Sequence, residues 1–274
     1  MAIISMIATT KQNKMEEYVL LTGASSGIGY EMATQLAANK LNLILVARSE
    51  TKLQQMQKEL TTMYGILVHF IVKDLSDVQA AIDIYQVLQR EDILVTALVN
   101  NAGVGNYGNF IETSLEEELN MIELNISSVV ALTKLFAKDM VSRKSGKIMN
   151  VASLLAFLPF PYQSVYSATK SFVLAFSETL AAELEGSGVV VTTLVPGTTE
   201  TAFISSEMRE TNLLKSNKPT PVKTVAAAGV KLLLHGKGKK VVGFQNRFNS
   251  ILPGIVPGAV MMKIKKYLVR QKSN

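Results

Sequence analysis

The chain has 274 residues, of which 48% are hydrophobic and 18% charged, a composition typical of a folded globular protein. It contains no cysteine and only two histidines, His69 and His235. This excludes disulfides and thiolate chemistry, and it argues against a multi-histidine zinc site or a Ser-His-Asp triad. The net charge of +6 is uneven, because residues 211–274 hold 13 Lys and Arg and no Asp or Glu, whereas residues 1–210 are net negative.

Short apolar runs alternate with helical stretches along most of the chain. Residues 1–14 are predicted to be a loose extension, 15–244 one nucleotide-binding and catalytic domain, and 245–274 a basic extension. The predicted strands are 18–22, 41–47, 66–72, 93–99, 147–151 and 189–195. The predicted helices are 28–39, 50–63, 76–90, 114–143 and 164–185. Continuous apolar strands that alternate with helices predict an α/β fold, a Rossmann-type doubly wound parallel sheet with helices on both faces.

A glycine-rich turn lies where the first predicted strand meets the first helix. It reads Thr22-Gly23-Ala24-Ser25-Ser26-Gly27-Ile28-Gly29. Glycines there let the backbone turn tightly and approach a pyrophosphate, whose charge is met by the N–H groups at the start of the helix. The spacing is G-x-x-x-G-x-G, which differs from the G-x-G-x-x-G of two-domain dehydrogenases.

Further motifs follow in a fixed order on the predicted elements. They are Asn100-Asn101-Ala102-Gly103, Asn125, Ser153, Tyr166-Ser167-Ala168-Thr169-Lys170 and Pro196-Gly197. From about residue 18 to residue 201 the sequence resembles the classical short-chain dehydrogenase/reductase family. The resemblance implies a nicotinamide nucleotide bound by Gly23, Ser25, Ser26, Gly27, Ile28, Gly29, Arg48, Ser49, Asp74, Leu75, Asn101, Ala102, Gly103, Tyr166, Lys170, Pro196, Gly197, Thr199 and Thr201.

The Tyr-x-x-x-Lys spacing predicts a proton-transfer site. Tyr166 and Lys170 are four residues apart, so on a helix they share one face. A nearby ammonium lowers the pKa of a phenol, which prepares it for proton transfer to or from a carbonyl or alcohol oxygen. Ser153 can donate a hydrogen bond to the same oxygen. The resemblance adds Asn125 as the residue that positions a water in a proton relay through Lys170, and no metal ligand is expected.

The end of the second predicted strand indicates the cofactor. Members of the family that prefer NAD have an Asp there, whereas this chain has Ala47-Arg48-Ser49. A guanidinium can pair with a 2′-phosphate, and no carboxylate is expected beside it, so the resemblance implies NADP(H) rather than NAD(H). Ser26 departs from the pattern, since many NADPH-using members have a basic residue there. Asp74 is either an adenine contact or the N-cap of the next helix.

The substrate segments are apolar. Residues 154–161, which follow Ser153, read LLAFLPFP, and residues 202–204 read AFI. We expect a small hydrophobic carbonyl or alcohol substrate, with part of this apolar content serving as core or subunit contact. Two alternatives stay open, an NADP-binding sensor with little turnover and a 3-oxoacyl-thioester reductase, against which the long tail argues. An epimerase or dehydratase would need a different glycine spacing.

The basic tail predicts either a membrane contact or a roof over the cleft. Val256, Val260, Ile264 and Leu268 form one helical stripe, with Lys263, Lys265, Lys266, Arg270 and Lys272 nearby. Such a stripe suits the surface of an anionic membrane, or packs on its own domain or a second subunit. No nucleic-acid motif is present. The chain is expected to be cytoplasmic, with peripheral membrane contact as an option, and the resemblance implies a homodimer or homotetramer.

Overall fold

The computed structural model describes residues 16–201, residue 211 and residues 218–269. In this part of the chain, seven parallel strands form one sheet in the order β3-β2-β1-β4-β5-β6-β7. The strands are β1 Glu17–Thr22, β2 Asn42–Ala47, β3 Val68–Val72, β4 Leu94–Asn100, β5 Gly146–Val151, β6 Val189–Val195 and β7 Gly238–Val241. The extension predicted for residues 1–14 and the apolar segment 202–204 lie outside the described residues.

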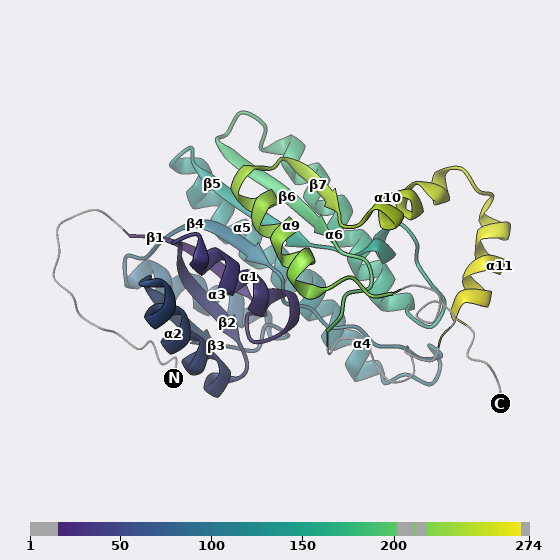
Figure 1. Cartoon of the computed structure of the whole chain (residues 1–274), viewed down its shortest axis with the longest axis horizontal. Coiled ribbons are helices and arrows are strands. Elements are labelled where there is room, and N and C mark those ends of the chain that lie inside the picture. Colours follow the sequence, from purple (N-terminus) through teal and green to yellow (C-terminus); the bar gives the residue numbers. More distant parts are fainter. Residues whose placement is uncertain (1–15, 202–210, 212–217, 270–274) are drawn as a thin grey trace.

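Helices cover both faces of this sheet (Figure 1). The sheet is flanked by α1 Gly27–Ala38, α2 Glu50–Tyr64 and α9 Val222–His235 on one face, and by α3 Val78–Arg90, α5 Ser128–Ser142 and α6 Ser164–Glu183 on the other. Short helices complete the chain, namely α4 Leu115–Ile122, the π-helical turn η1 Glu123–Ser127, the 3₁₀ turns η2 Leu154–Ala156 and η3 Leu252–Gly254, α10 Phe244–Ile251 and α11 Gly258–Val269.

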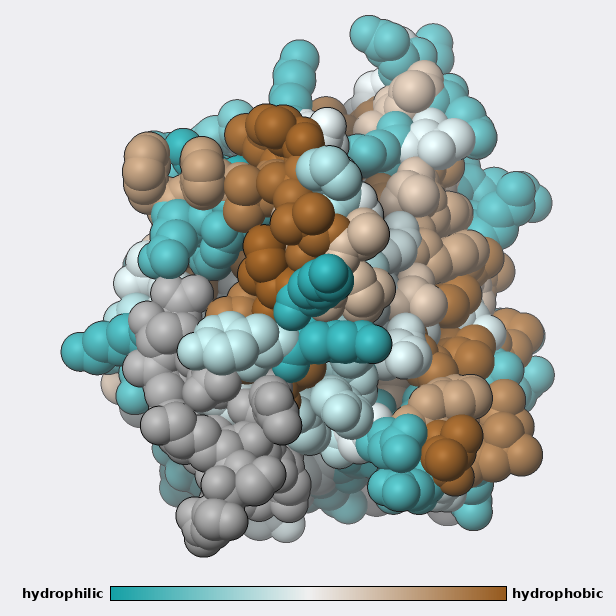
Figure 2. Space-filling model, turned by 90° about the vertical axis from the view of Figure 1, so that its right-hand side faces the viewer, coloured by the Kyte–Doolittle hydropathy of each residue, from teal (hydrophilic) through white to brown (hydrophobic). Residues whose placement is uncertain are grey.

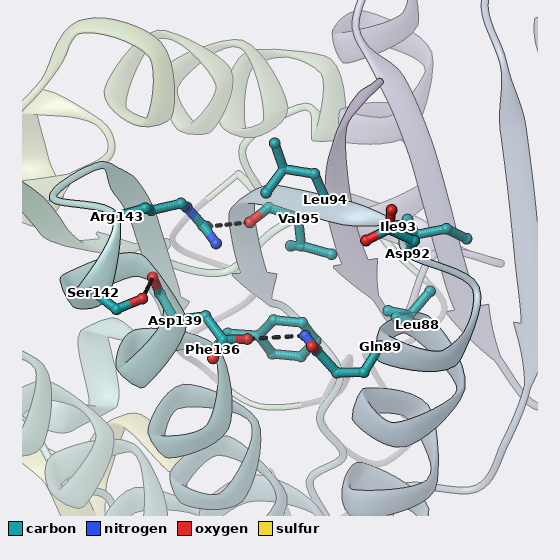
Figure 3. A pocket seen from close by; sticks show the side chains of 10 residues that line it. All are labelled: Leu88, Gln89, Asp92, Ile93, Leu94, Val95, Phe136, Asp139, Ser142 and Arg143. Carbon is teal, nitrogen blue, oxygen red and sulfur yellow. Dashed lines mark hydrogen bonds between the residues drawn. The ribbon is translucent and has the colours of Figure 1, made fainter. Parts of the chain in front are cut away.

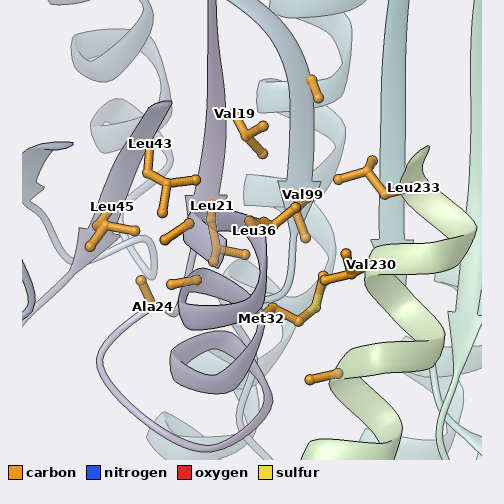
Figure 4. Close-up of a cluster of buried hydrophobic side chains, with 14 of the residues drawn as sticks. Val19, Leu21, Ala24, Met32, Leu36, Leu43, Leu45, Val99, Val230 and Leu233 are labelled. Atoms are coloured by element: carbon orange, nitrogen blue, oxygen red, sulfur yellow. The ribbon is translucent and has the colours of Figure 1, made fainter. Parts of the chain in front are cut away.

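Residues on the two faces of β1 to β6 enter opposite cores. In β1, Val19 and Leu21 pack with the α1 and α9 side, where Leu36 and Val230 complete the cluster drawn in Figure 4. Tyr18 and Leu20 of the same strand enter the second cluster. Because both faces of β1 to β6 are buried, these strands read as continuous apolar runs, and the sequence predicts them. The edge strand β7 was not predicted, because its residues are exposed or half-buried and include two lysines. The doubly wound parallel fold is confirmed.

The strand order places a crevice at one edge of the sheet. The chain runs outward from β1 to β2 and β3, and then returns to place β4 on the other side of β1. The loops that leave β1 and β4 therefore diverge to opposite faces. Ligands of open α/β sheets bind at this point, beyond the carboxyl ends of the strands.

The helix predicted at 114–143 is instead three segments. A π-helical turn, η1, separates α4 from α5 and holds Asn125. The run Leu115–Ser142 is long and apolar enough to cross a membrane. However, Leu132, Phe136 and Met140 are buried against the sheet. Part of its apolar content therefore belongs to the core of the fold, as expected for a core helix.

The predicted C-terminal stripe is divided between two sides of the helix. Val256 and Leu268 pack inward, whereas Val260 and Ile264 are 49% and 46% exposed. The inward face of α11 is Met261, Lys265, Leu268 and Val269, spaced as one helical side. The expectation that Lys265 adds to an outward charged border was wrong, because this side chain is buried.

Candidate active site

The glycine turn brings the backbone into contact with itself. A Cβ at Gly29 would lie 2.2 Å from the carbonyl oxygen of Gly23, and a Cβ at Gly23 would lie 2.8 Å from Cα of Ala102. Any side chain at Gly23 or Gly29 would therefore clash with the backbone around this turn, which we call the glycine cradle. Ser26 is the N-cap of α1 and makes no side-chain capping bond, so the first N–H groups of the helix stay open. Ser25, Gly27 and Ile28 line the same turn, and the cradle fits a pyrophosphate.

Thr22 and Asn101 hold the turn against the loop after β4. The Thr22 hydroxyl accepts hydrogen bonds from the backbone N–H groups of Asn101 and Ala102, both at 3.0 Å. The Asn101 amide donates to the carbonyl oxygens of Thr22 at 3.0 Å and Gly23 at 3.2 Å. The side chain of Asn101 thus braces the cradle. Sequence reasoning missed Thr22, although it begins the motif.

Ser153, Tyr166 and Lys170 come together at the carboxyl end of β5. All three side chains are buried, with Tyr166 and Lys170 on the face of α6 turned toward the sheet. The hydroxyls of Ser153 and Tyr166 are hydrogen-bonded, and Nζ of Lys170 donates to the carbonyl oxygen of Val151 at 3.0 Å. Nζ lies 5.8 Å from the centroid of the Tyr166 ring.

Burial, more than the ammonium, determines the charge of this pair. Desolvation raises the pKa of Tyr166 to about 12, against a smaller lowering from the Ser153 hydrogen bond. Desolvation also lowers the pKa of Lys170 to about 8. The expected lowering of the Tyr166 pKa by Lys170 was therefore wrong for the protein alone. At neutral pH the phenol keeps its proton and can donate it, while Lys170 is mainly charged.

Asn125 lies in the π-helical turn and is completely buried. Its Oδ1 accepts from the N–H of Val104 at 3.0 Å, and its Nδ2 donates to the Val104 carbonyl at 2.9 Å and to the Thr169 hydroxyl at 3.1 Å. A Cβ at Gly103 would lie 3.0 Å from Oδ1 of Asn125 and 3.2 Å from Nζ of Lys170. Asn125 thus braces the loop after β4 and lies beside the space that Lys170 faces.

Arg48 and Asp74 form an exposed pair at the ends of β2 and β3. The guanidinium lies 3.6 Å from the Asp74 carboxylate, with 70% and 48% of the two side chains exposed. The expectation of no carboxylate beside Arg48 was wrong. Partial burial raises the pKa of Asp74, but hydrogen bonds from Ser76 and the charge of Arg48 outweigh it and leave the pKa below its usual value. Exposed pairs of this kind contribute about 0–1 kcal/mol, so Arg48 can exchange partners.

The other residues predicted at this edge of the sheet take different positions. Asp77 caps α3 by accepting from the N–H of Gln79 at 2.9 Å, so Asp74 is not the N-cap. Ser49 precedes α2 as its N-cap residue and makes no side-chain capping bond. Leu75 is buried in the core beneath this edge. Any contact of Leu75 with an adenine would therefore involve its backbone.

The segment after β6 closes the cradle from the other side. The Pro196 carbonyl accepts from the N–H of Leu154, and the Thr199 hydroxyl donates to the Gly197 carbonyl at 3.0 Å. The methyl group of Thr201 would lie 3.2 Å from a Cβ at Gly27. Asn246 of α10 would lie 2.3 Å from a Cβ at Gly197. Sequence reasoning missed Asn246, since no spacing links residue 246 to the cradle.

Helix α11 roofs the loop that follows Ser153. Leu158 and Phe160 are buried in one cluster with Met261 and Val269. The hydroxyl of Tyr107, on the loop after β4, donates to the carbonyl of Val269 at 2.8 Å. Part of the apolar content expected to line a substrate pocket thus packs against the C-terminal helix.

A separate hollow of about 200 Å³ lies at the opposite edge of the sheet (Figure 3). It is lined from α3, α5 and the beginning of β4, where the Arg143 guanidinium donates to the Val95 carbonyl and Gln89 donates to Asp139 at 2.9 Å. These are the amino ends of the strands. The hollow is therefore remote from Ser153 and Tyr166, and it does not belong to the site.

Comparison with known proteins agrees with the fold described above. Residues 17–212 match the profile of the short chain dehydrogenase family. The chain is 32% identical over 249 residues to the very-long-chain 3-oxoacyl-CoA reductase of Anas platyrhynchos, covering 89% of this chain and 74% of the relative. It is 35% identical over 205 residues to 17-beta-hydroxysteroid dehydrogenase type 3 of Mus musculus, covering 72% and 66%. A short-chain dehydrogenase from Sphingobium yanoikuyae, solved in complex with NADPH, superposes with a TM-score of 0.76 at 27% identity, covering 89% and 97%.

Gly29→Ala tests the cradle. The new methyl group meets the backbone of Gly23, which no side-chain rotation can relieve, so we expect the turn to shift and NADPH affinity to fall by about tenfold or more. Fluorescence titration with NADPH measures this loss. Gly254→Ala is the control, because a Cβ there has nothing within 4 Å. An unchanged affinity in the Gly29 variant would contradict the assignment.

Proposed function

The chain belongs to the short-chain dehydrogenase family, and on this premise we propose that it reduces the carbonyl group of a hydrophobic substrate, with Tyr166 as the proton donor. The protein is an NADP(H)-dependent oxidoreductase. The observation that carries the proposal is the buried arrangement of Ser153, Tyr166 and Lys170 beside the glycine cradle. We assign residues 15–244 to the catalytic domain and residues 245–274 to an extension.

The side chains of this site divide the chemistry between them. NADPH, when bound, supplies the hydride. Tyr166 is protonated at neutral pH, so its phenol can donate a proton to the carbonyl oxygen as negative charge develops there. The Ser153 hydroxyl is hydrogen-bonded to Tyr166 and can stabilise the same oxygen. The Lys170 ammonium stabilises the phenolate that remains. Asn125 lies beside the space that Lys170 faces, and a water held there would return a proton to Tyr166 through Lys170.

The nucleotide is proposed to lie along the carboxyl ends of β1, β2 and β4. The open N-terminus of α1 would bind the pyrophosphate and Arg48 the 2′-phosphate. Thr199 and Thr201 would close over it. The solved NADPH complex of the Sphingobium relative supports this choice of nucleotide.

Two substrate classes are suggested by the relatives. One is named a very-long-chain 3-oxoacyl-CoA reductase and the other a 17-beta-hydroxysteroid dehydrogenase. The apolar loop at residues 154–160 suits either class. The 3-oxoacyl thioester alternative is supported by two reductase relatives, which are 32% and 31% identical over 89% and 90% of this chain. We propose the 3-oxoacyl thioester first and the steroid ketone second.

A substrate panel separates these classes. NADPH oxidation is followed with 3-oxoacyl-CoA esters of increasing chain length, with steroid ketones and with small aromatic ketones. Our proposal expects the kcat/KM values to rise with acyl chain length. Tight NADPH binding without turnover of any compound would support a sensor instead.

For assembly and location we propose a cytoplasmic homo-oligomer. Phe172 on α6 and Leu119 on α4 are large apolar side chains at the surface, 40% and 52% exposed, which supports a subunit contact along these helices. The rings of Phe172 and Phe176 are stacked with their centroids 5.9 Å apart, and so present a preformed aromatic surface.

We also propose peripheral contact with an anionic membrane through the C-terminal helix.

Tyr166→Phe removes the proton donor and leaves the ring to pack. We expect kcat to fall by at least about 100-fold, the scale of general acid–base catalysis, with NADPH affinity retained. Steady-state kinetics and nucleotide titration measure the two quantities. Turnover near that of the unmodified enzyme would overturn the mechanism.

The rate of carbonyl reduction should depend on the charge of Lys170. Its pKa is about 8, so the ammonium is present below that pH and is lost above it, whereas Tyr166, with a pKa of about 12, stays protonated. We therefore expect kcat/KM to decline as the pH rises through about 8, because this constant reports groups of the free enzyme. Circular dichroism at each pH provides the folding control. A flat profile up to about pH 10 would contradict the role of Lys170.

Arg48→Asp reverses the charge expected to meet the 2′-phosphate. NADPH affinity should fall by about tenfold or more, while NADH affinity changes little or rises. Arg48→Ala serves as the comparison, since it removes the cation and leaves Asp74 in place. If the preference for NADPH over NADH survives both substitutions, Arg48 does not discriminate between the nucleotides.

A further inference from the structure

The C-terminal helices expose an apolar surface. Among the residues that the structure describes, eight of the 19 large exposed hydrophobic side chains lie between residues 244 and 267. We define the outer apolar face as Phe244, Phe248, Ile251, Ile255, Val260 and Ile264, whose exposed fractions run from 46% to 89%. Figure 2 looks onto this end of the molecule and shows a patch of apolar side chains with hydrophilic side chains next to it.

The helical spacing orients this face. Phe244, Phe248 and Ile251 are at positions i, i+4 and i+7 of α10, and Val260 and Ile264 are at i and i+4 of α11. The opposite side of α11 packs on the loop after Ser153. Helix α11 therefore has one side packed on the protein and another side on which Val260 and Ile264 are exposed to solvent.

The charges next to the outer apolar face have one sign. Arg247, Lys263 and Lys266 lie beside it and form no ion pair in the described part of the chain. Residues 211–274 contain no Asp or Glu at all. A two-fold contact between identical faces would place these cations opposite one another, which disfavours a second copy as the partner. Apolar side chains with a border of lysines suit a bilayer that carries anionic headgroups.

We propose that the outer apolar face docks on an anionic lipid bilayer, and that this docking places the entrance of the substrate cleft at the membrane surface. The second part rests on the proposed function. Leu158 and Phe160 contact the inner side of α11, so the loop after Ser153 is one helix away from the docked face. A hydrophobic carbonyl compound dissolved in the bilayer reaches the cleft without crossing water.

Vesicle co-sedimentation of the full chain tests the docking. The vesicles are phosphatidylcholine alone or phosphatidylcholine mixed with phosphatidylglycerol, at low salt and at about 1 M salt, where charges are screened beyond about 3 Å. We expect binding to the anionic vesicles at low salt, with the bound fraction reduced by high salt. A protein that stays in the supernatant with anionic vesicles at low salt overturns the proposal.

Matched variants locate the binding surface. Ile255→Glu with Ile264→Glu should lower the partition coefficient on anionic vesicles by on the order of tenfold or more. The control, Met63→Glu with Leu67→Glu, changes exposed apolar residues near the end of α2, on the opposite side of the molecule in Figure 1, and should bind as before. Equal loss in both variants, or no loss in the first, overturns the proposal. Size-exclusion chromatography adds a second test. An oligomer that is lost in the Ile255/Ile264 variant but kept in the control would also overturn the proposal.

Turnover separates this proposal from the proposed function. With a water-soluble ketone, the Ile255/Ile264 variant should keep the rate of the unmodified protein, because neither residue is in the catalytic site. With a bilayer-dissolved ketone in anionic vesicles, we expect its rate to fall about fivefold or more while the Met63/Leu67 control does not change. Equal rates of variant and control on the bilayer-dissolved ketone overturn the delivery step alone. Vesicle binding without turnover of any ketone overturns the proposed function and leaves the docking intact.

Discussion

Parallel strands can be joined only by crossovers, so the carboxyl ends of all strands meet at one edge of the sheet. The whole site depends on this constraint. The glycine turn follows β1, the brace of Asn101 follows β4, Ser153 follows β5, and Pro196-Gly197 follows β6. Residues separated by more than 170 positions thus share one crevice. At the opposite edge, the hollow beside Arg143 has none of these loops.

Within the crevice, burial determines the chemistry. The same desolvation raises the pKa of Tyr166, so that the phenol stays protonated, and lowers the pKa of Lys170 toward neutral pH. The acid therefore holds its proton before the reaction, and the cation is placed where a phenolate would form. The π-helical turn contributes indirectly, because Asn125 fixes the loop at Val104 beside Lys170. A neutral donor next to a buried cation suits reduction of a carbonyl group better than a phenolate at rest.

The C-terminal helices connect this chemistry to the surroundings of the protein. The inner side of α11 holds Leu158 and Phe160 in place and receives the hydrogen bond of Tyr107. The outer side shows apolar residues to solvent, next to lysines without ion pairs in the described chain. One helix therefore supports the substrate loop and, in our proposal, also meets the bilayer. A shift of α11 at the membrane would move the residues that contact Leu158 and Phe160, and so would move the loop after Ser153.

The sequence by itself determined the fold class and most of the residues that the structure gathers in the crevice. Buried parallel strands leave continuous apolar runs, and the motifs follow those runs at fixed positions, so local patterns were enough. The partners within the site were decided only by the tertiary structure. Asp74 lies beside Arg48, Asn246 lies over Gly197, and Lys265 turns inward, although no spacing in the chain indicates any of these contacts. The pKa of Tyr166 was also misjudged, since residue spacing reveals a neighbouring charge but not the loss of water around it. Burial and contacts between distant segments depend on how the helices pack on the sheet, and a linear pattern does not contain that information.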